Sequence, residues 1–267
     1  MKIIHHISFH QKEVPAFQRC GVEPELLEGG DLVHLATADI AEDDPRWNEV
    51  SQLIKKLKAL DVPFTKFSDD ELRSARHLAV LPNWHHGYPQ PEGDFDYLSA
   101  TYDLSSYCRT CGIGAKQIRP FRMKKEPTWG KHSILQLNWV FDEYFVRPET
   151  WHSIFEQFGI GFRPVLHHKT GNQLQSIVQL DITQTTDLKT ENLALTQCSV
   201  CKRQKYSPTV TGFFPAPSST YLVLAKSRQY FGSGASAFQQ IMVGHELYVK
   251  IKKAGMKGAD FQACKAE

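Results

Sequence analysis

Hydrophobic and polar residues follow one another along the chain in patterns that predict both strands and helices. Residues 1–9 carry closely spaced isoleucine and phenylalanine side chains and predict a strand, and residues 32–37 predict another. In residues 44–60, apolar side chains recur every three or four positions, which is the period of a helix with one buried face. The first part of the chain therefore contains elements of both kinds.

A second helix is predicted over residues 68–78, because Ser68 and Glu71 have the spacing of a capping box. The short apolar run at 79–82 predicts a strand directly after it. The segment 82–94 is rich in proline and glycine, and such composition is typical of a loop.

Two segments in the later part of the chain resemble each other. Residues 144–162 and 240–258 each contain an apolar strand followed by a helix, and the helices end at Gly159 and Gly255. A constant offset between the two segments favours an internal strand–helix duplication. Two strand–helix units also resemble each other by chance, so both interpretations stay open.

Further apolar runs at 132–141 and 176–183 have the length of strands. Strands and helices are therefore mixed along the chain without a regular alternation. The expected fold class is α+β, with mixed strands and helices around a two-knuckle site that resembles a zinc ribbon.

The chain has 267 residues, which is enough for one large domain or two small ones with a real hydrophobic core. No segment approaches the run of about 20 apolar residues that a membrane-spanning helix needs. The first residues also lack the apolar stretch of a signal peptide. We therefore expect a cytoplasmic protein without a membrane partner.

The net charge of +2 hides a difference between the two parts of the chain. Residues 1–100 contain 10 basic and 17 acidic residues, whereas residues 101–267 contain 21 basic and 12 acidic residues. This change predicts a module boundary near residue 100. We expect an acidic α/β N-terminal module over 1–100 and a zinc-binding α+β module over 101–267.

Four of the six cysteines form two CxxC pairs, Cys108 with Cys111 and Cys198 with Cys201. In a reducing compartment, CxxC pairs indicate a metal or redox motif rather than disulfides. Four thiolates around one Zn²⁺ form a closed tetrahedral site with no position for water, so such a zinc is structural. A thioredoxin-like redox pair and ordinary reduced cysteines are the alternatives.

Basic residues surround both CxxC pairs. This pattern favours either a solvated face that offsets the charge of the thiolate site or a surface for an acidic protein partner, and a nucleic-acid surface is the alternative. The overall charge of +2 is small for a protein dedicated to nucleic acid. The expected partner-binding residues are Arg119, Arg122, Lys124 and Lys125, and the basic residues after the second pair are Lys202, Arg203 and Lys205.

The segments "CRTCG" at 108–112 and "CSVCK" at 198–202, with the ending at 231–264, resemble the double-CXXCG motif family of bacterial immunity proteins. The resemblance covers roughly residues 100–267. It implies a cytoplasmic protein that binds and neutralises a toxin delivered by sibling cells. It also implies a binding protein and not an enzyme.

Two other functions remain open from the sequence. The first is a nucleic-acid-associated zinc-ribbon protein that uses the basic residues. The second is an enzyme whose site is assembled from scattered residues such as His85, Asp94 and Asp96. The sequence contains no nucleophile elbow, phosphate loop or HExxH motif that would identify the chemistry of such an enzyme.

Overall fold

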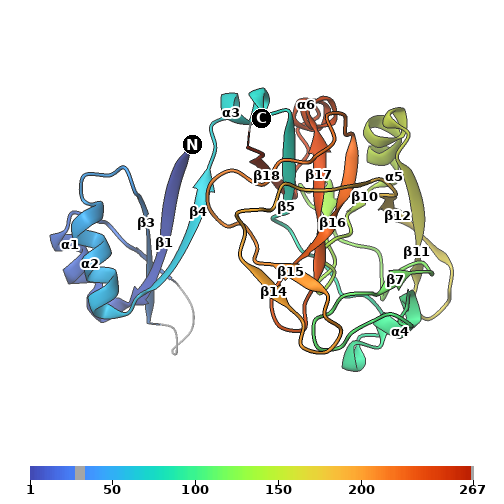
Figure 1. Cartoon of the computed structure of the whole chain (residues 1–267), viewed down its shortest axis with the longest axis horizontal. Helices are drawn as coiled ribbons and strands as arrows, with labels where there is room; N and C mark the ends of the chain where they lie inside the picture. The colour runs from blue at the N-terminus through green and yellow to red at the C-terminus, as the bar shows by residue number, and fades with distance from the viewer. Residues whose placement is uncertain (28–33, 266–267) are drawn as a thin grey trace. The chain divides into compact units, whose positions relative to one another are not determined.

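The structure is a computed structural model that describes residues 1–27 and 34–265 (Figure 1). The chain divides into two compact units. The first comprises Met1–Glu71 with Thr209–Phe213, and the second comprises Leu72–Pro208 with Phe214–Glu267. Each unit has hydrophobic clusters of its own.

The first unit is an antiparallel sheet with the strand order β2-β3-β1-β4. Apolar side chains of β1 and β3 pack on the buried face of α2, where Val50 and Ile54 lie. The elements are β1 (Lys2–His10), a 3₁₀ turn (Gln11–Glu13), α1 (Val14–Arg19), β2 (Glu25–Leu26), β3 (Leu35–Ala41), α2 (Trp47–Leu57) and β4 (Leu60–Lys66).

The predicted strand at 1–9 and the predicted helix at 44–60 are confirmed as β1 and α2. The helix ends earlier than predicted because Lys58 adopts a left-handed conformation with φ 55°, and Leu60 already begins β4. The strand predicted at 32–37 is β3, which runs on to Ala41. Residues 32 and 33 of that prediction lie outside the described residues.

The capping box that predicted the second helix is confirmed. The backbone N–H of Ser68 donates to Glu71, and the backbone N–H of Glu71 donates to the Ser68 hydroxyl. The helix itself, α3 (Asp69–Ser74), is shorter than predicted. Its expected last residues belong instead to β5 (His77–Pro82), which includes the strand predicted at 79–82.

The second unit contains a seven-stranded sheet with the order β14-β15-β16-β17-β5-β18, in which β13 pairs with β16. Figure 1 shows β5, which comes early in the chain, between β17 and β18 from its end. The other strands of this sheet are β13 (Thr185–Thr186), β14 (Leu195–Gln197), β15 (Gln204–Tyr206), β16 (Leu224–Phe231), β17 (Phe238–Gly244) and β18 (Ala259–Ala263).

A five-stranded sheet of the same unit has the order β8-β11-β12-β10-β9. Its strands are β8 (Arg122–Met123), β9 (Ile134–Leu135), β10 (Phe145–Val146), β11 (Gly161–His167) and β12 (Gln173–Asp181). The strand predicted at 176–183 is β12, whereas only two residues of the segment 132–141 enter the sheet as β9. A small sheet pairs β6 (Tyr102–Asp103) with β7 (Lys116–Gln117), after a 3₁₀ turn (Gly93–Phe95) and α4 (Tyr97–Thr101).

The two larger sheets contain the same arrangement of three strands. In one sheet β12 lies between β10 and β11, and Val178 pairs with Val146 and Pro164. In the other sheet β5 lies between β17 and β18, and Ala79 pairs with Met242 and Gln262. Both sets are antiparallel. The structural similarity therefore extends beyond residues 144–162 and 240–258, the two segments that resemble each other in sequence.

The predicted strand, helix and final glycine are present in both segments of the repeat. After β10 the chain forms α5 (Pro148–Thr150), a π-helical turn (Trp151–Phe155) and a 3₁₀ turn (Glu156–Phe158), and it ends at Gly159 with φ 72°. After β17 it forms α6 (His245–Lys253), and Gly255 follows with φ 63°. The order of elements in the repeat is therefore confirmed.

One hydrophobic cluster joins both sheets and both of these helical segments. Val178 of β12, Val243 of β17 and Leu78 of β5 are buried in it together with Ile154 and Leu247 from the helical segments. Alternate residues of the same strands point away from this shared cluster. Met242 and Ile177 therefore lie in two separate clusters on the opposite faces of their sheets. This shared core makes the second unit one folded body.

The boundary expected near residue 100 differs from the division in the structure. The chain divides next to residue 71, and β5 is an inner strand of the seven-stranded sheet with Leu78 and Ala79 fully buried. The change in net charge near residue 100 is a property of exposed side chains, whereas the extent of a unit follows from buried strand pairing. The loop predicted at 82–94 lies inside the second unit.

Candidate metal centre and adjacent cavity

The four cysteines of the two CxxC pairs meet at one point. Their Sγ atoms all lie within 4.8 Å of one another, although the pairs are far apart in the sequence. Sγ of Cys108 is 3.9 Å from Sγ of Cys198, and Sγ of Cys111 is 3.6 Å from Sγ of Cys201. A tetrahedron with zinc–sulfur bonds of ~2.3 Å has edges of about 3.8 Å, so these separations suit one metal ion.

The two knuckles have the same backbone hydrogen bonds. The N–H of Cys108 donates to the carbonyl of Ile113, and the N–H of Cys198 donates to the carbonyl of Arg203, both at 2.9 Å. The residue after the second cysteine also donates back to the first in each knuckle. Each knuckle therefore presents its two sulfurs on one side of a tight turn.

The residue after the second cysteine has a left-handed backbone in both knuckles. Gly112 has φ 80°, and Lys202 has φ 62°. A Cβ atom at Gly112 would come within 2.3 Å of the carbonyl oxygen of Ala235, so packing requires glycine there. Lys202 is exposed, and its ammonium donates to the carbonyl of Ser199. Its departure from the CxxCG pattern therefore leaves the second turn intact.

Hydrogen bonds and burial change the thiol pKa values in opposite directions. The backbone N–H and the guanidinium of Arg203 lower the pKa of Cys201 to about 6. The backbone N–H of Cys111 lowers the pKa of Cys108. Burial raises the pKa of Cys111 to about 11. Without a metal, a thiolate is most stable at the half-exposed Cys201, and a bound dication would stabilise the others.

Lys205 of β15 connects the first knuckle to the loop between β16 and β17. Its side chain is buried, and its ammonium donates to the carbonyl oxygens of Cys111, Gly234 and Ser236 at 2.7–2.9 Å. A buried ammonium needs such partners, because burial of an unpaired charge is costly. The sequence grouped Lys205 with the exposed basic residues, but its role is internal.

The remaining basic residues occupy edges of the second unit. Arg119, Lys124 and Lys125 are exposed, and Arg122 is half-buried on the edge strand β8. The ammonium of Lys124 lies 2.6 Å from a carboxylate oxygen of Glu92. Part of the positive charge in this set is therefore offset by a neighbouring acid.

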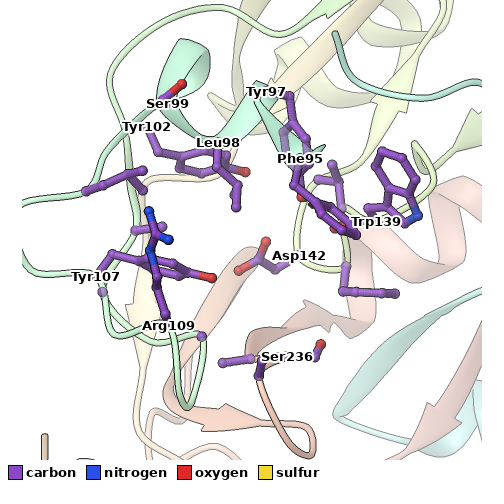
Figure 2. A pocket seen from close by; sticks show the side chains of 18 of the residues that line it. Phe95, Tyr97, Leu98, Ser99, Tyr102, Tyr107, Arg109, Trp139, Asp142 and Ser236 are labelled. Atoms are coloured by element: carbon purple, nitrogen blue, oxygen red, sulfur yellow. Dashed lines mark hydrogen bonds between the residues drawn. The ribbon is translucent and has the colours of Figure 1, made fainter. Parts of the chain in front are cut away.

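A cavity of about 580 Å³ lies beside the first knuckle (Figure 2). Arg109, Gly112 and Gly114 from the knuckle segment form part of its wall, and Ala235 and Ser236 from the loop held by Lys205 form another part. Further lining comes from α4 and the 3₁₀ turn before it, from β6 and the residues that follow it, from the segment 139–142, and from Tyr230 of β16 and Gln239 of β17. The first knuckle and the loop held by Lys205 therefore form one side of this cavity.

Two of the three residues considered for an enzyme site belong to this cavity. Asp94 and Asp96 line it, whereas His85 forms an isolated bridge with Gln136. The residues that the sequence predicts for a site do not include Asp142, Trp139 or the tyrosines of the lining. They come from separate segments of the chain, so no local motif brings them together in the sequence.

Comparison with family models, with curated proteins and with solved structures finds no match to this chain. None of the helices formed by the described residues is both long and apolar enough to cross a membrane.

Proposed function

We propose that this chain is a zinc-stabilised binding protein, in which Cys108, Cys111, Cys198 and Cys201 hold one structural Zn²⁺. The observation that carries the proposal is the convergence of four Sγ atoms within 4.8 Å. Four sulfur donors suit zinc, and four protein ligands leave no position for water or substrate. The metal then connects two distant turns and has no chemical step of its own.

The finer proposal is a cytoplasmic immunity protein that neutralises a partner toxin. Its support is the resemblance of the two knuckles and the chain end to the double-CXXCG motif family. A reducing compartment is consistent with this proposal, because thiols kept reduced remain available to zinc. The exposed residues Arg119, Lys124 and Lys125, with Arg122, are the proposed contact surface for an acidic partner.

The test uses the partner that is captured from the native cell and then purified. Association of the two purified proteins is measured at low salt with the wild type and with a variant that changes Arg119, Arg122, Lys124 and Lys125 to glutamate. Charge complementarity mainly raises association rates, so we expect the variant to associate at least tenfold more slowly. A matched control changes Lys252 and Lys253 of α6 to glutamate, and we expect its rate to stay near that of the wild type.

An unchanged rate in the four-residue variant would exclude this surface as the contact. Binding of random DNA with a strong salt dependence, in place of a protein partner, would favour the zinc-ribbon nucleic-acid function.

A further inference from the structure

The cavity beside the first knuckle has a negative lining. Asp94, Asp96 and Asp142 are among its lining residues, and Arg109 is the cationic residue among them. The backbone N–H of Gln239 donates to one oxygen of Asp142 at 3.3 Å. In Figure 2 the Asp142 carboxylate lies at the centre of the view, with the Tyr107 hydroxyl pointing toward it. A ligand in the cavity therefore has the carboxylate of Asp142 within the lining that it meets.

Aromatic rings form the walls around this carboxylate. Tyr102 and Tyr107 lie on one side of Asp142 in Figure 2, and Phe95 and Trp139 lie on the other. The ring centroids of Phe95 and Trp139 are 4.7 Å apart. The faces of aromatic rings carry partial negative charge and attract cations, and indole is the strongest of these groups.

The tyrosine hydroxyls stay neutral in this environment. Burial, and then the charge of Asp142, raises the pKa of Tyr102 and of Tyr230. These phenols therefore serve as hydrogen-bond donors and acceptors at neutral pH and add no charge. The negative charge of the lining comes from the aspartates.

Three residues of the lining other than glycine hold a left-handed backbone, which is uncommon for residues with a side chain. They are Asp94 with φ 46°, Phe95 with φ 60° and Trp139 with φ 69°. Such conformations cost about 1–3 kcal/mol each and persist where the surrounding structure fixes them, often at ligand sites. Here they fix the positions of two aromatic walls and one acid.

We propose that this cavity binds an organic cation, an alkylammonium or methylated ammonium group, with Asp142 as its counter-ion and with Tyr102, Tyr107 and Trp139 as its aromatic walls. The group is carried by a free amine or by a lysine side chain of a protein partner. The volume of about 580 Å³ lies in the range of small-molecule sites, so it has room for the whole of a small amine. This inference goes beyond the proposed function and does not depend on it.

The test measures ligand binding by calorimetry with the full-length, zinc-loaded protein. The probes are choline, n-butylammonium and Nα-acetyl-lysine-N-methylamide, and the matched neutral probe is 3,3-dimethylbutan-1-ol, which has the shape of choline without its charge. We expect at least one of the cations to bind at least tenfold more tightly than the neutral alcohol. Tightest binding of choline or butylammonium assigns the site to a free amine, and tightest binding of the lysine derivative assigns it to a protein side chain.

Two variants with opposite expected effects test the role of charge. Asp142→Asn is expected to weaken cation binding at least tenfold, whereas Arg109→Gln removes a repelling charge and is expected to strengthen it. Asp260→Asn, an exposed aspartate of β18 outside the lining, is the matched control and is expected to bind like the wild type. If Asp142→Asn does not fold, as judged by circular dichroism and zinc content, Arg109→Gln alone decides the test.

Binding of all three cations no tighter than that of the neutral alcohol would overturn the proposal. Weaker cation binding in Arg109→Gln would also overturn it, because that result indicates a site for anions. Loss of the zinc by itself leaves the charge of the lining unchanged. A wrong structural role for the metal would therefore appear in the zinc content and stability of the protein, and not in the comparison between the charged and neutral probes.

Discussion

The four cysteine side chains have equivalent places in two turns, and each is expected to be a zinc ligand. Replacing Cys108 with alanine leaves three sulfur donors, so we expect the purified protein to lose its zinc, from one ion per chain to nearly none by elemental analysis. Cys20→Ser is the matched control, because Cys20 belongs to the hydrophobic cluster of the first unit. Full zinc content in Cys108→Ala would show that this thiol is not a ligand.

Lys205 is a second residue on which the first knuckle depends. Lys205→Met keeps the length of the side chain but removes the ammonium, which leaves three carbonyl oxygens without this donor. We expect the free energy of unfolding to fall by roughly 2–4 kcal/mol, measured by denaturant titration. Lys169→Met, at an exposed position, is expected to change it by less than about 0.5 kcal/mol. Equal values for the two variants would contradict an internal role for Lys205.

The two knuckles can be compared directly, because one has glycine and the other has lysine at the same backbone position. Gly112→Ala forces a Cβ atom against the carbonyl of Ala235, so we expect a lower melting temperature and weaker zinc retention against a chelator. Lys202→Gly removes the strain of a lysine with a left-handed backbone. We expect it to keep or raise the melting temperature, with a gain of up to about 1 kcal/mol in the free energy of unfolding. A smaller fall in melting temperature for Gly112→Ala than for Lys202→Gly would contradict these expectations.

Patterns within short stretches of sequence predicted the elements that depend on interactions between near neighbours in the chain. The amphipathic period predicted the position of α2, the Ser68–Glu71 spacing predicted the start of α3, and the two CxxC pairs predicted the cysteine cluster that could hold a metal ion. The position of β5 inside the distant sheet could not be predicted, because strand order depends on long-range pairing. The cavity was missed for the same reason, since Asp142 and Trp139 show no pattern of their own in the sequence.

The second unit consists of two matching halves, each with one knuckle, and the halves exchange their inner strands. β5 precedes the first knuckle but lies in the sheet of β17 and β18, and β12 precedes the second knuckle but lies in the sheet of β10 and β11. Each half also contributes two sulfurs to the metal centre. The proposed zinc would therefore connect the same two halves that the strands already join.

Removal of the metal is expected to destabilise the second unit and to leave the first unchanged, because the two have separate clusters. Structural zinc contributes on the order of 10 kcal/mol in small zinc domains, and the larger core here reduces the expected loss. With a chelator, hydrogen exchange should speed up in peptides covering 108–113 and 198–206. Peptides of β1 and β3 should exchange as before, and faster exchange there as well would contradict independent stability of the first unit.

The central claim is one structural zinc held by four sulfur atoms. X-ray absorption at the zinc edge of the purified, full-length protein tests it most directly, because it counts the ligand atoms and measures their distances. We expect one zinc per chain with four sulfur neighbours at ~2.3 Å and no nitrogen or oxygen neighbour. Fewer than four sulfur neighbours, or an oxygen neighbour at ~2.0 Å, would contradict a closed structural site.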